Sequence, residues 1–224
     1  MNQVLNQNVG KIIVSRGKNP KQLYAHQIEA LHKLNKLTGE KKYKGMLVFP
    51  TGGGKTFTAV SWLLKNAVDA NKKVLWIAHR HELLNQAKYT IQNSAYSDVL
   101  PNRQDFTYRI ISGMHDRPVN INTDDDIIIA SKDSLNYGME YLKKWIIKNR
   151  NNIVLIIDEA HHAPAKSYRK IINLLETENN EWFQMLGLTA TPFRTAESEQ
   201  GILGKIFTNG IAYGIDLNTL IRDR

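Results

Sequence analysis

Three consecutive glycines followed by a lysine and a threonine stand in the stretch VFPTGGGKTFTAV, residues 48–60. Because glycine lacks a Cβ, successive backbone N–H groups can turn toward one point and bind phosphate oxygens there. A strand-like segment precedes the glycines and a helix-like segment follows, so the helix N-terminus adds partial positive charge at that point. The sequence therefore predicts a phosphate-binding loop made by Thr51, Gly52, Gly53 and Gly54.

The two residues after the glycines complete this predicted site. Lys55 can reach the β and γ phosphates of a nucleotide, and the Thr56 hydroxyl can bind Mg²⁺. The strict pattern G-x-x-x-x-G-K-[S/T] requires glycine at position 49, where this chain has Phe49. A glycine-rich turn with a chance Lys-Thr pair is the competing interpretation, which the flanking strand and helix disfavour.

Two adjacent carboxylates end a buried-looking strand in the stretch IVLIIDEAHHAP, residues 153–164. In an open α/β sheet, ligands bind beyond the carboxyl ends of the strands. Asp158 would then lie near the nucleotide and hold Mg²⁺, while Glu159 would orient and deprotonate the attacking water. An exposed turn that carries two acids is the alternative, and the upstream phosphate loop disfavours it.

Two histidine pairs, His79 with His81 and His161 with His162, invite the hypothesis of a metal site. Side chains adjacent on one backbone seldom converge on a single ion, and the chain has no cysteine to help. We therefore expect these histidines to make hydrogen bonds within the fold.

Strand and helix patterns alternate along the chain. Mostly continuous apolar runs, typical of strands buried on both faces of a parallel sheet, occur at 46–49, 74–78, 108–112, 126–130, 153–157 and 185–189. Helical patterns occupy 26–37, 55–67, 81–91, 134–147, 167–175 and 204–207, and polar loops occupy 92–106 and 113–125. This alternation predicts an α/β fold with a central, mainly parallel sheet and helices on both faces.

The length, charge and cysteine content of the chain indicate what kind of protein it is. The 224 residues suit one large α/β domain, and the apolar run 153–157 is far too short to cross a membrane. The net charge is +9, of which residues 1–45 carry +7, and a basic excess favours polyanionic partners. The absence of cysteine and of a signal-like N-terminus leads us to expect a cytoplasmic protein.

Three stretches in order, PTGGGKT (50–56), DEAH (158–161) and TAT (189–191), resemble the first RecA-like domain of superfamily 2 helicases and translocases. The DEAH-type group with restriction-enzyme motor subunits is the most similar. The resemblance covers nearly the whole chain and implies a P-loop NTPase fold, ATP and Mg²⁺ as cofactors, and nucleic acid as partner, with DNA favoured over RNA.

The resemblance also implies roles for further residues. Gln27 in LYAHQIEAL matches the glutamine that recognises adenine, and a polar helix residue without that role is the alternative. His161, Thr189 and Thr191 match residues that couple nucleotide to nucleic acid. The residues that match contacts to the nucleic-acid backbone are Arg80, Ser112, Gly113, Ser131 and Lys132.

Members of this family place ATP between two RecA-like domains, and the second domain supplies arginines to the transferring phosphate. Residues 192–224 are too few to encode such a domain, so we expect 1–224 to be one domain of a longer protein, with 1–45 as a basic extension. The competing hypotheses are a P-loop ATPase without a nucleic-acid role and a non-catalytic nucleic-acid-binding module.

Overall fold

A twisted eight-stranded sheet forms the centre of the computed structural model, which describes residues 8–191 and 197–222. The strand order is β1-β4-β5-β3-β6-β7-β2-β8, and every described pairing is parallel except the antiparallel pair β1–β4. The strands are β1 (Val9–Ile13), β2 (Lys42–Val48), β3 (Lys73–Ala78), β4 (Asp105–Ile111), β5 (Ile127–Ser131), β6 (Ile153–Asp158), β7 (Phe183–Thr189) and β8 (Ile211–Gly214).

The six strands predicted from apolar runs are present, and their ends differ from the predictions by at most four residues. All residues of β5, β6 and β7 are buried, as expected for central strands that are covered on both faces. The two edge strands, β1 and β8, were not predicted. Their burial patterns are mixed, so neither segment carries a continuous apolar run.

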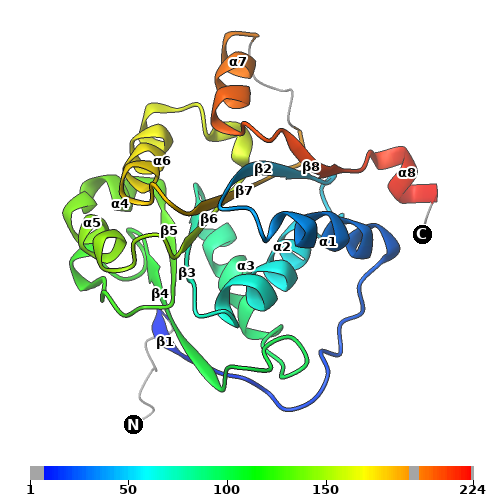
Figure 1. The fold of residues 1–224 in the computed structure, drawn as a ribbon, viewed down its shortest axis with the longest axis horizontal. Coiled ribbons are helices and arrows are strands. Elements are labelled where there is room, and N and C mark those ends of the chain that lie inside the picture. Colours follow the sequence, from blue (N-terminus) through cyan, green and yellow to red (C-terminus); the bar gives the residue numbers. More distant parts are fainter. Residues whose placement is uncertain (1–7, 192–196, 223–224) are drawn as a thin grey trace.

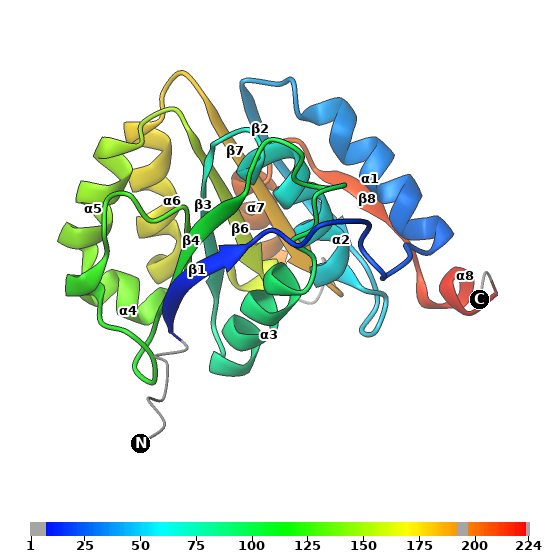
Figure 2. The same cartoon turned by 90° about the horizontal axis from the view of Figure 1, so that it is seen from below.

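Helices cover both faces of the sheet and enclose two separate apolar cores (Figures 1 and 2). One face carries α1 (Ala25–Leu37), α2 (Lys55–Leu63), which continues into a π-helical turn at Leu64–Val68, and α3 (His81–Gln92). The other carries α4 (Lys132–Tyr137), α5 (Met139–Lys148) and α6 (Lys166–Glu178), and the end of α7 (Glu197–Ile206) joins this second core. The last described helix is α8 (Leu217–Arg222).

The helix predicted at 134–147 is instead two helices, α4 and α5, that meet at Gly138. A Cβ on Gly138 would lie 2.0 Å from the Cβ of Pro118, so the chain passes too close to Pro118 for any larger residue. The helix predicted at 204–207 is the end of the longer α7. None of the described helices has the length and hydropathy that a bilayer span requires.

The carboxyl ends of three neighbouring strands are level with one another. β7 lies between β6 and β2, and its residues Leu188 and Thr189 pair with Asp158 and Val48. The segment after β2 and the segment after β6 therefore emerge at the same rim of the sheet, two strand spacings apart, which is about 9.5 Å. We call this the carboxyl rim, and the opposite one the amino rim.

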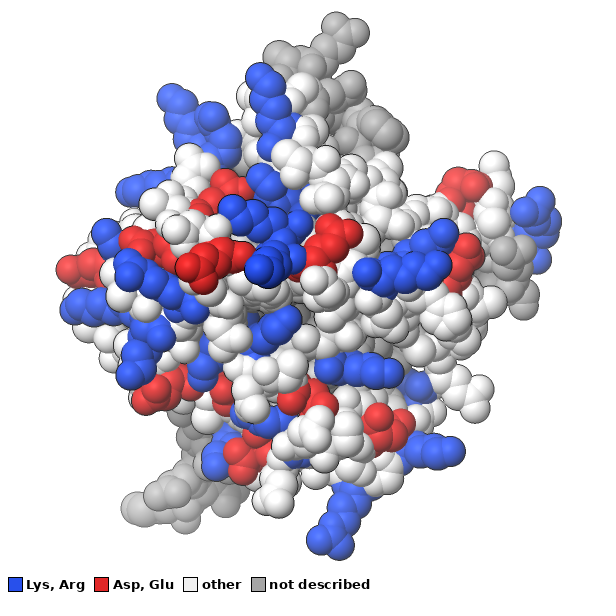
Figure 3. Space-filling view, viewed as in Figure 1, with Lys and Arg blue, Asp and Glu red and all other residues white. Residues whose placement is uncertain are grey.

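Charged side chains of both signs are interspersed on the face shown in Figure 3. Part of the basic excess of the N-terminal extension is paired: Lys11 lies 3.3 Å from Asp105, and Lys44 lies 2.7 Å from Glu176. The local charge around each site is therefore a better guide to its ligand than the net charge of the chain.

Candidate functional site

The glycine loop at the carboxyl end of β2 has a backbone that favours glycine at two positions. Gly52 and Gly54 have φ angles of +80° and +82°, in the left-handed region that residues with a Cβ rarely adopt. The Gly53 N–H donates to the Pro50 carbonyl at 2.9 Å and closes the turn. Helix α2 begins at Lys55, so the loop delivers the chain directly to a helix N-terminus.

Phe49 stands where the strict pattern requires glycine, and the structure shows what it does there. Its side chain is fully buried, with ring centroids 5.3 Å from His26 and 5.8 Å from Tyr213. The ring fills the core beneath the loop, so it replaces the missing glycine without blocking the side where phosphate would bind.

Two side chains of helix α1 contact the Gly53 carbonyl of the glycine loop. The Gln27 side chain is buried; its Nε2 donates to the Gly53 carbonyl at 3.4 Å, and its Oε1 accepts from the Tyr24 N–H at 3.0 Å. His26 Nε2 lies 3.0 Å from the same Gly53 carbonyl, a contact that the sequence did not predict. Adenine recognition by Gln27 stays a prediction; these two hydrogen bonds use one of the two amide N–H donors and one of the two oxygen lone pairs.

The two carboxylates after β6 lie in contrasting environments. Asp158 is only 3% exposed, and burial, reinforced by the neighbouring charge of Glu159, raises its pKa to about 6. The Glu159 N–H donates to Asp158 Oδ1 at 3.0 Å, and Lys55 opposes the rise in pKa. Glu159 itself has a φ of +52°, a strained conformation for a residue with a Cβ. A buried carboxylate with a raised pKa beside a strained residue is typical of a functional site.

A single cavity of about 400 Å³ joins the loop to the acid pair. Its oxygen donors, the Thr56 hydroxyl and the two carboxylates, are ligands that Mg²⁺ prefers, and Lys55 adds the charge that phosphate requires. The donor set therefore fits a magnesium–nucleotide complex. The lining residues are Lys21, Thr51, Gly52, Gly54, Lys55, Thr56, Phe57, Leu83, Gln86, Thr90, Asp158 and Glu159.

The three residues assigned a coupling role form a chain of contacts that starts at this cavity. Glu159 Oε2 lies 3.4 Å from His161 Nδ1, which lies 3.2 Å from Thr189 Oγ1. The Thr189 hydroxyl is fully buried and accepts from the Thr191 N–H at 3.2 Å. A displacement of Glu159 can therefore reach the segment after β7 through hydrogen-bonded neighbours.

A second, larger hollow of about 1170 Å³ lies farther along the carboxyl rim, beyond β4 and β5; we call it the rim groove. It brings together three residues predicted to contact nucleic acid: Ser112, Gly113 and Ser131. Arg80, exposed at the N-cap of α3, and Lys132, at the start of α4, adjoin residues that line the groove but do not line it themselves.

Two of the predicted hydroxyl groups already have partners in the protein. Ser131 Oγ accepts from the Ser134 N–H at 3.2 Å and so caps α4. Ser112 Oγ lies 3.0 Å from His81 Nδ1 and 2.5 Å from His115 Nδ1. His115 Nε2 in turn lies 2.9 Å from Asn85 Oδ1. Sequence inspection missed this cluster, because its members are separated by up to 34 positions along the chain.

Three further histidines also gather at this rim. The ring of His162 lies 4.1 Å from that of His161 and 4.5 Å from that of His79, measured between centroids. Among the described residues, no group of three or more His, Cys, Asp or Glu side chains has the arrangement of a metal site. These histidines contact one another and the fold.

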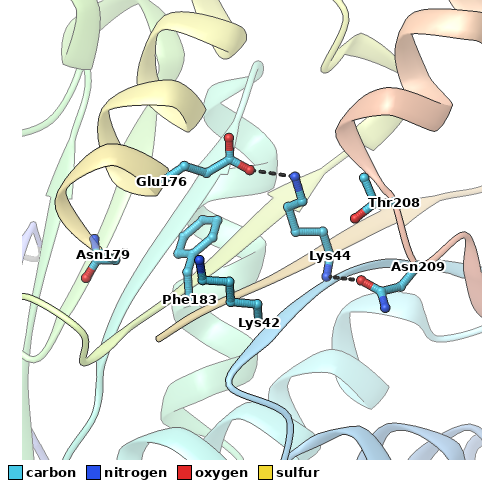
Figure 4. Close-up of a pocket in the computed structure, with 7 residues that line it drawn as sticks. All are labelled: Lys42, Lys44, Glu176, Asn179, Phe183, Thr208 and Asn209. Carbon is cyan, nitrogen blue, oxygen red and sulfur yellow. Dashed lines mark hydrogen bonds and ion pairs between the residues drawn. The ribbon is translucent and has the colours of Figure 1, made fainter. Parts of the chain in front are cut away.

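A third hollow, of about 280 Å³, lies at the amino rim where β2 and β7 begin (Figure 4). In it, Lys44 Nζ donates to Glu176 at 2.7 Å, and the Lys44 N–H donates to Asn209 Oδ1 at 2.9 Å. Lys44 and Glu176 thus satisfy each other, and the hollow lies at the end of the strands where open α/β sheets do not bind ligands.

The fold and the carboxyl-rim site define a RecA-like nucleotide-binding domain. The helicase domain of Hef from Pyrococcus furiosus superposes with a TM-score of 0.61 at 16% identity, covering 86% of this chain and 39% of that one. The predicted fold class is confirmed: an α/β domain with a mostly parallel sheet and RecA-like helicase domains as structural neighbours.

The chain belongs to the family described as "Type III restriction enzyme, res subunit", whose model matches residues 20–194, and it is a superfamily 2 helicase ATP-binding domain. It is 32% identical to "Putative helicase 22" of Sulfolobus islandicus filamentous virus over 189 residues, and this aligned region covers 80% of the chain. It is 28% identical over 170 residues to "Putative ATP-dependent DNA helicase fml2" of Schizosaccharomyces pombe, over 70% of this chain.

The matched region is a minor part of these relatives. It covers 30% of the viral protein and 19% of the yeast protein. Family membership therefore establishes the domain, and the activity, substrate and partners of a whole protein are matters for proposal.

Proposed function

We propose that the chain binds and hydrolyses ATP as one half of a nucleic-acid helicase or translocase. The observation that carries this proposal is the single cavity in which the glycine loop and the acid pair meet. Neither element alone would suffice, because phosphoryl transfer requires both a phosphate cradle and a group that positions the attacking water.

The residues of the glycine loop, the acid pair and Gln27 take separate tasks in this proposal. The loop amides of residues 52–54 and Lys55 bind the phosphates, and Thr56 and Asp158 hold Mg²⁺. The bound cation supplies neutralisation of the charge that develops on the phosphate oxygens. Glu159 orients the attacking water and accepts its proton, and Gln27 recognises adenine.

Nucleic acid is proposed to bind at the rim groove and beside it. Backbone N–H groups, short hydroxyls and cations at strand ends suit contacts to phosphate that do not read sequence. The residues proposed for these contacts are Arg80, Ser112, Gly113, Ser131 and Lys132. We propose DNA rather than RNA because the name of the fission-yeast relative specifies a DNA helicase.

A second RecA-like domain is proposed to complete the ATP site with arginine. In P-loop enzymes, such an arginine raises turnover by about 10³–10⁵-fold. The 224-residue chain by itself should therefore bind ATP–Mg²⁺ and hydrolyse it very slowly. His161, Thr189 and Thr191 would pass the state of the nucleotide to the bound strand.

The test is to measure binding of a single-stranded DNA and of an RNA of the same sequence to the 224-residue chain at several salt concentrations, together with ATP turnover. We expect DNA affinity to fall linearly with the logarithm of salt concentration, and turnover to stay slow. Absence of oligonucleotide binding would leave a P-loop ATPase without a nucleic-acid role. Rapid turnover stimulated by nucleic acid would contradict the need for a second domain.

A further inference from the structure

The rim groove exposes large apolar side chains that the backbone contacts proposed above do not use. Tyr137 is 92% exposed, Met114 74% and Val119 52%, and all three line the groove. Exposed to this extent, these side chains gain almost nothing from folding. Apolar residues gathered in one polar-rimmed groove mark a place where a ligand buries them.

The walls that carry these side chains are rigidly anchored. Arg109 donates to Asp116 and to Asp125, both at 2.6 Å, and these bonds fix the ends of the segment between β4 and β5. That segment packs against the α4–α5 junction, where Pro118 leaves no room for a Cβ on Gly138. Because Tyr137 directly precedes Gly138, its backbone is held in place before any ligand arrives, which lowers the entropic cost of binding.

The charges on the two walls of the groove differ in sign. The segment after β4 contributes the cation Arg117, whereas α4 and α5 contribute the anions Asp133 and Glu140. Lys132 does not make the helical wall positive, because its Nζ lies 2.5 Å from Asp133 Oδ1 and the two charges offset each other. A phosphate backbone is attracted to Arg117 and repelled by Asp133 and Glu140, so the proposed phosphate contacts at Ser131 and Lys132, where α4 begins, are the weaker ones. A strand lying in the groove would therefore turn its bases toward the helical wall, where Tyr137 stands.

We propose that Tyr137, facing the groove together with Met114, is a stacking platform for the bases of single-stranded nucleic acid; this inference rests on the proposed nucleic-acid-binding function. Every base has a flat π-face, so stacking on tyrosine requires no particular sequence. The bases of a duplex are stacked on one another and are not available to the platform. The rim groove thus selects single strands, whereas contacts to phosphate do not.

The test compares two fluorescein-labelled oligonucleotides of equal length and charge, a (dT)₁₂ strand and an abasic strand, by fluorescence anisotropy at low salt. The wild-type 224-residue chain should bind (dT)₁₂ more tightly than the abasic strand. Tyr137→Ala should weaken (dT)₁₂ binding by about 5- to 150-fold, the value of one stacked base, and leave abasic binding unchanged. Tyr137→Phe, which keeps the ring, should retain wild-type affinity for (dT)₁₂.

Ile147→Ala is the control, because Ile147 is 40% exposed on α5 and does not line the groove. It should change neither affinity. Equal binding of both oligonucleotides by the wild-type chain, or equal weakening of both by Tyr137→Ala, would overturn the platform while leaving the proposed function in place. If the wild-type chain bound neither oligonucleotide, the proposed function would fail and the platform with it.

Discussion

Two aspartates at opposite rims of the sheet, the half-buried Asp126 and the buried Asp158, have pKa values shifted in opposite directions. Asp126, just before β5 at the amino rim, accepts from the Thr107 N–H at 2.9 Å and pairs with Lys73 and Arg103 at 3.0 and 3.1 Å. These donors outweigh the effect of burial and lower its pKa. Asp158, at the carboxyl rim, has one backbone donor at 3.0 Å and a repelling neighbour, Glu159, and its pKa rises to about 6.

The opposite pKa shifts distinguish a carboxylate that stabilises the fold, Asp126, from one that serves a ligand site, Asp158. At the amino rim, the partners of Asp126 are supplied by the protein, so ionisation of the carboxylate favours the folded state. At the carboxyl rim, the protein leaves Asp158 with little compensation and Glu159 in a strained conformation, which costs stability unless a ligand supplies the missing positive charge. Substitutions at the two rims should therefore separate loss of stability from loss of activity.

Glu159→Gln should have the largest effect, and on activity alone. Loss of a general base lowers turnover by about 10²–10⁴-fold, while the amide keeps the shape of the side chain. Single-turnover hydrolysis of radiolabelled ATP should fall by this factor relative to the wild-type chain. Both ATP affinity and the urea-induced unfolding free energy should stay close to wild type. Retained turnover would show that another group activates the water.

Asp126→Asn should cost stability without touching the ATP site. The substitution leaves Lys73 and Arg103, both mostly buried, without their counter-charge. We expect the unfolding free energy measured in urea at pH 7 to fall by about 2–3 kcal/mol. ATP binding by the folded variant should be unchanged, and a stability equal to wild type would contradict the structural role of the pair.

Asp158→Asn should act in the opposite direction and stabilise the ligand-free chain. Because the folded-state pKa of Asp158 is raised from 3.8 to about 6, the wild-type chain loses stability as pH rises through this range. Asparagine does not ionise, so the variant should be more stable by about 2–3 kcal/mol at pH 8. The difference should vanish below pH 4. A variant that is less stable than wild type at pH 8 would contradict the comparison with Asp126.

The central strands could be predicted from sequence because burial on both faces leaves an uninterrupted apolar run, as in β6. The edge strands could not, because pairing rather than local composition defines them: Val9 pairs with Arg109, one hundred positions away. The α4–α5 break was missed because the apolar stripe continues across Gly138, where the backbone leaves the helical conformation and Pro118 leaves room only for glycine.

The nucleotide site, like the fold, could be predicted from the sequence only in part. Residues adjacent in sequence, such as Lys55 and Thr56, could be assigned from a short pattern, because one loop carries them. The contact of His26 with the Gly53 carbonyl could not be predicted from the sequence. Nor could the hydrogen bonds that join His81, Ser112 and His115, since each contact depends on elements that meet only in the folded chain. The exposed apolar side chains of the rim groove were missed because exposure, unlike burial, leaves no periodic pattern in the sequence.

The central claim is that the glycine loop and the acid pair hold one ATP–Mg²⁺ complex, and calorimetric ATP titrations with and without Mg²⁺ test it most directly. Lys55→Ala should lose ATP binding in both conditions, because the phosphate contact is gone. Asp158→Asn should keep the Mg²⁺-free affinity and lose the gain that Mg²⁺ gives the wild-type chain. If Asp158→Asn showed the same gain from Mg²⁺ as the wild type, the acid pair would not share the nucleotide with the loop.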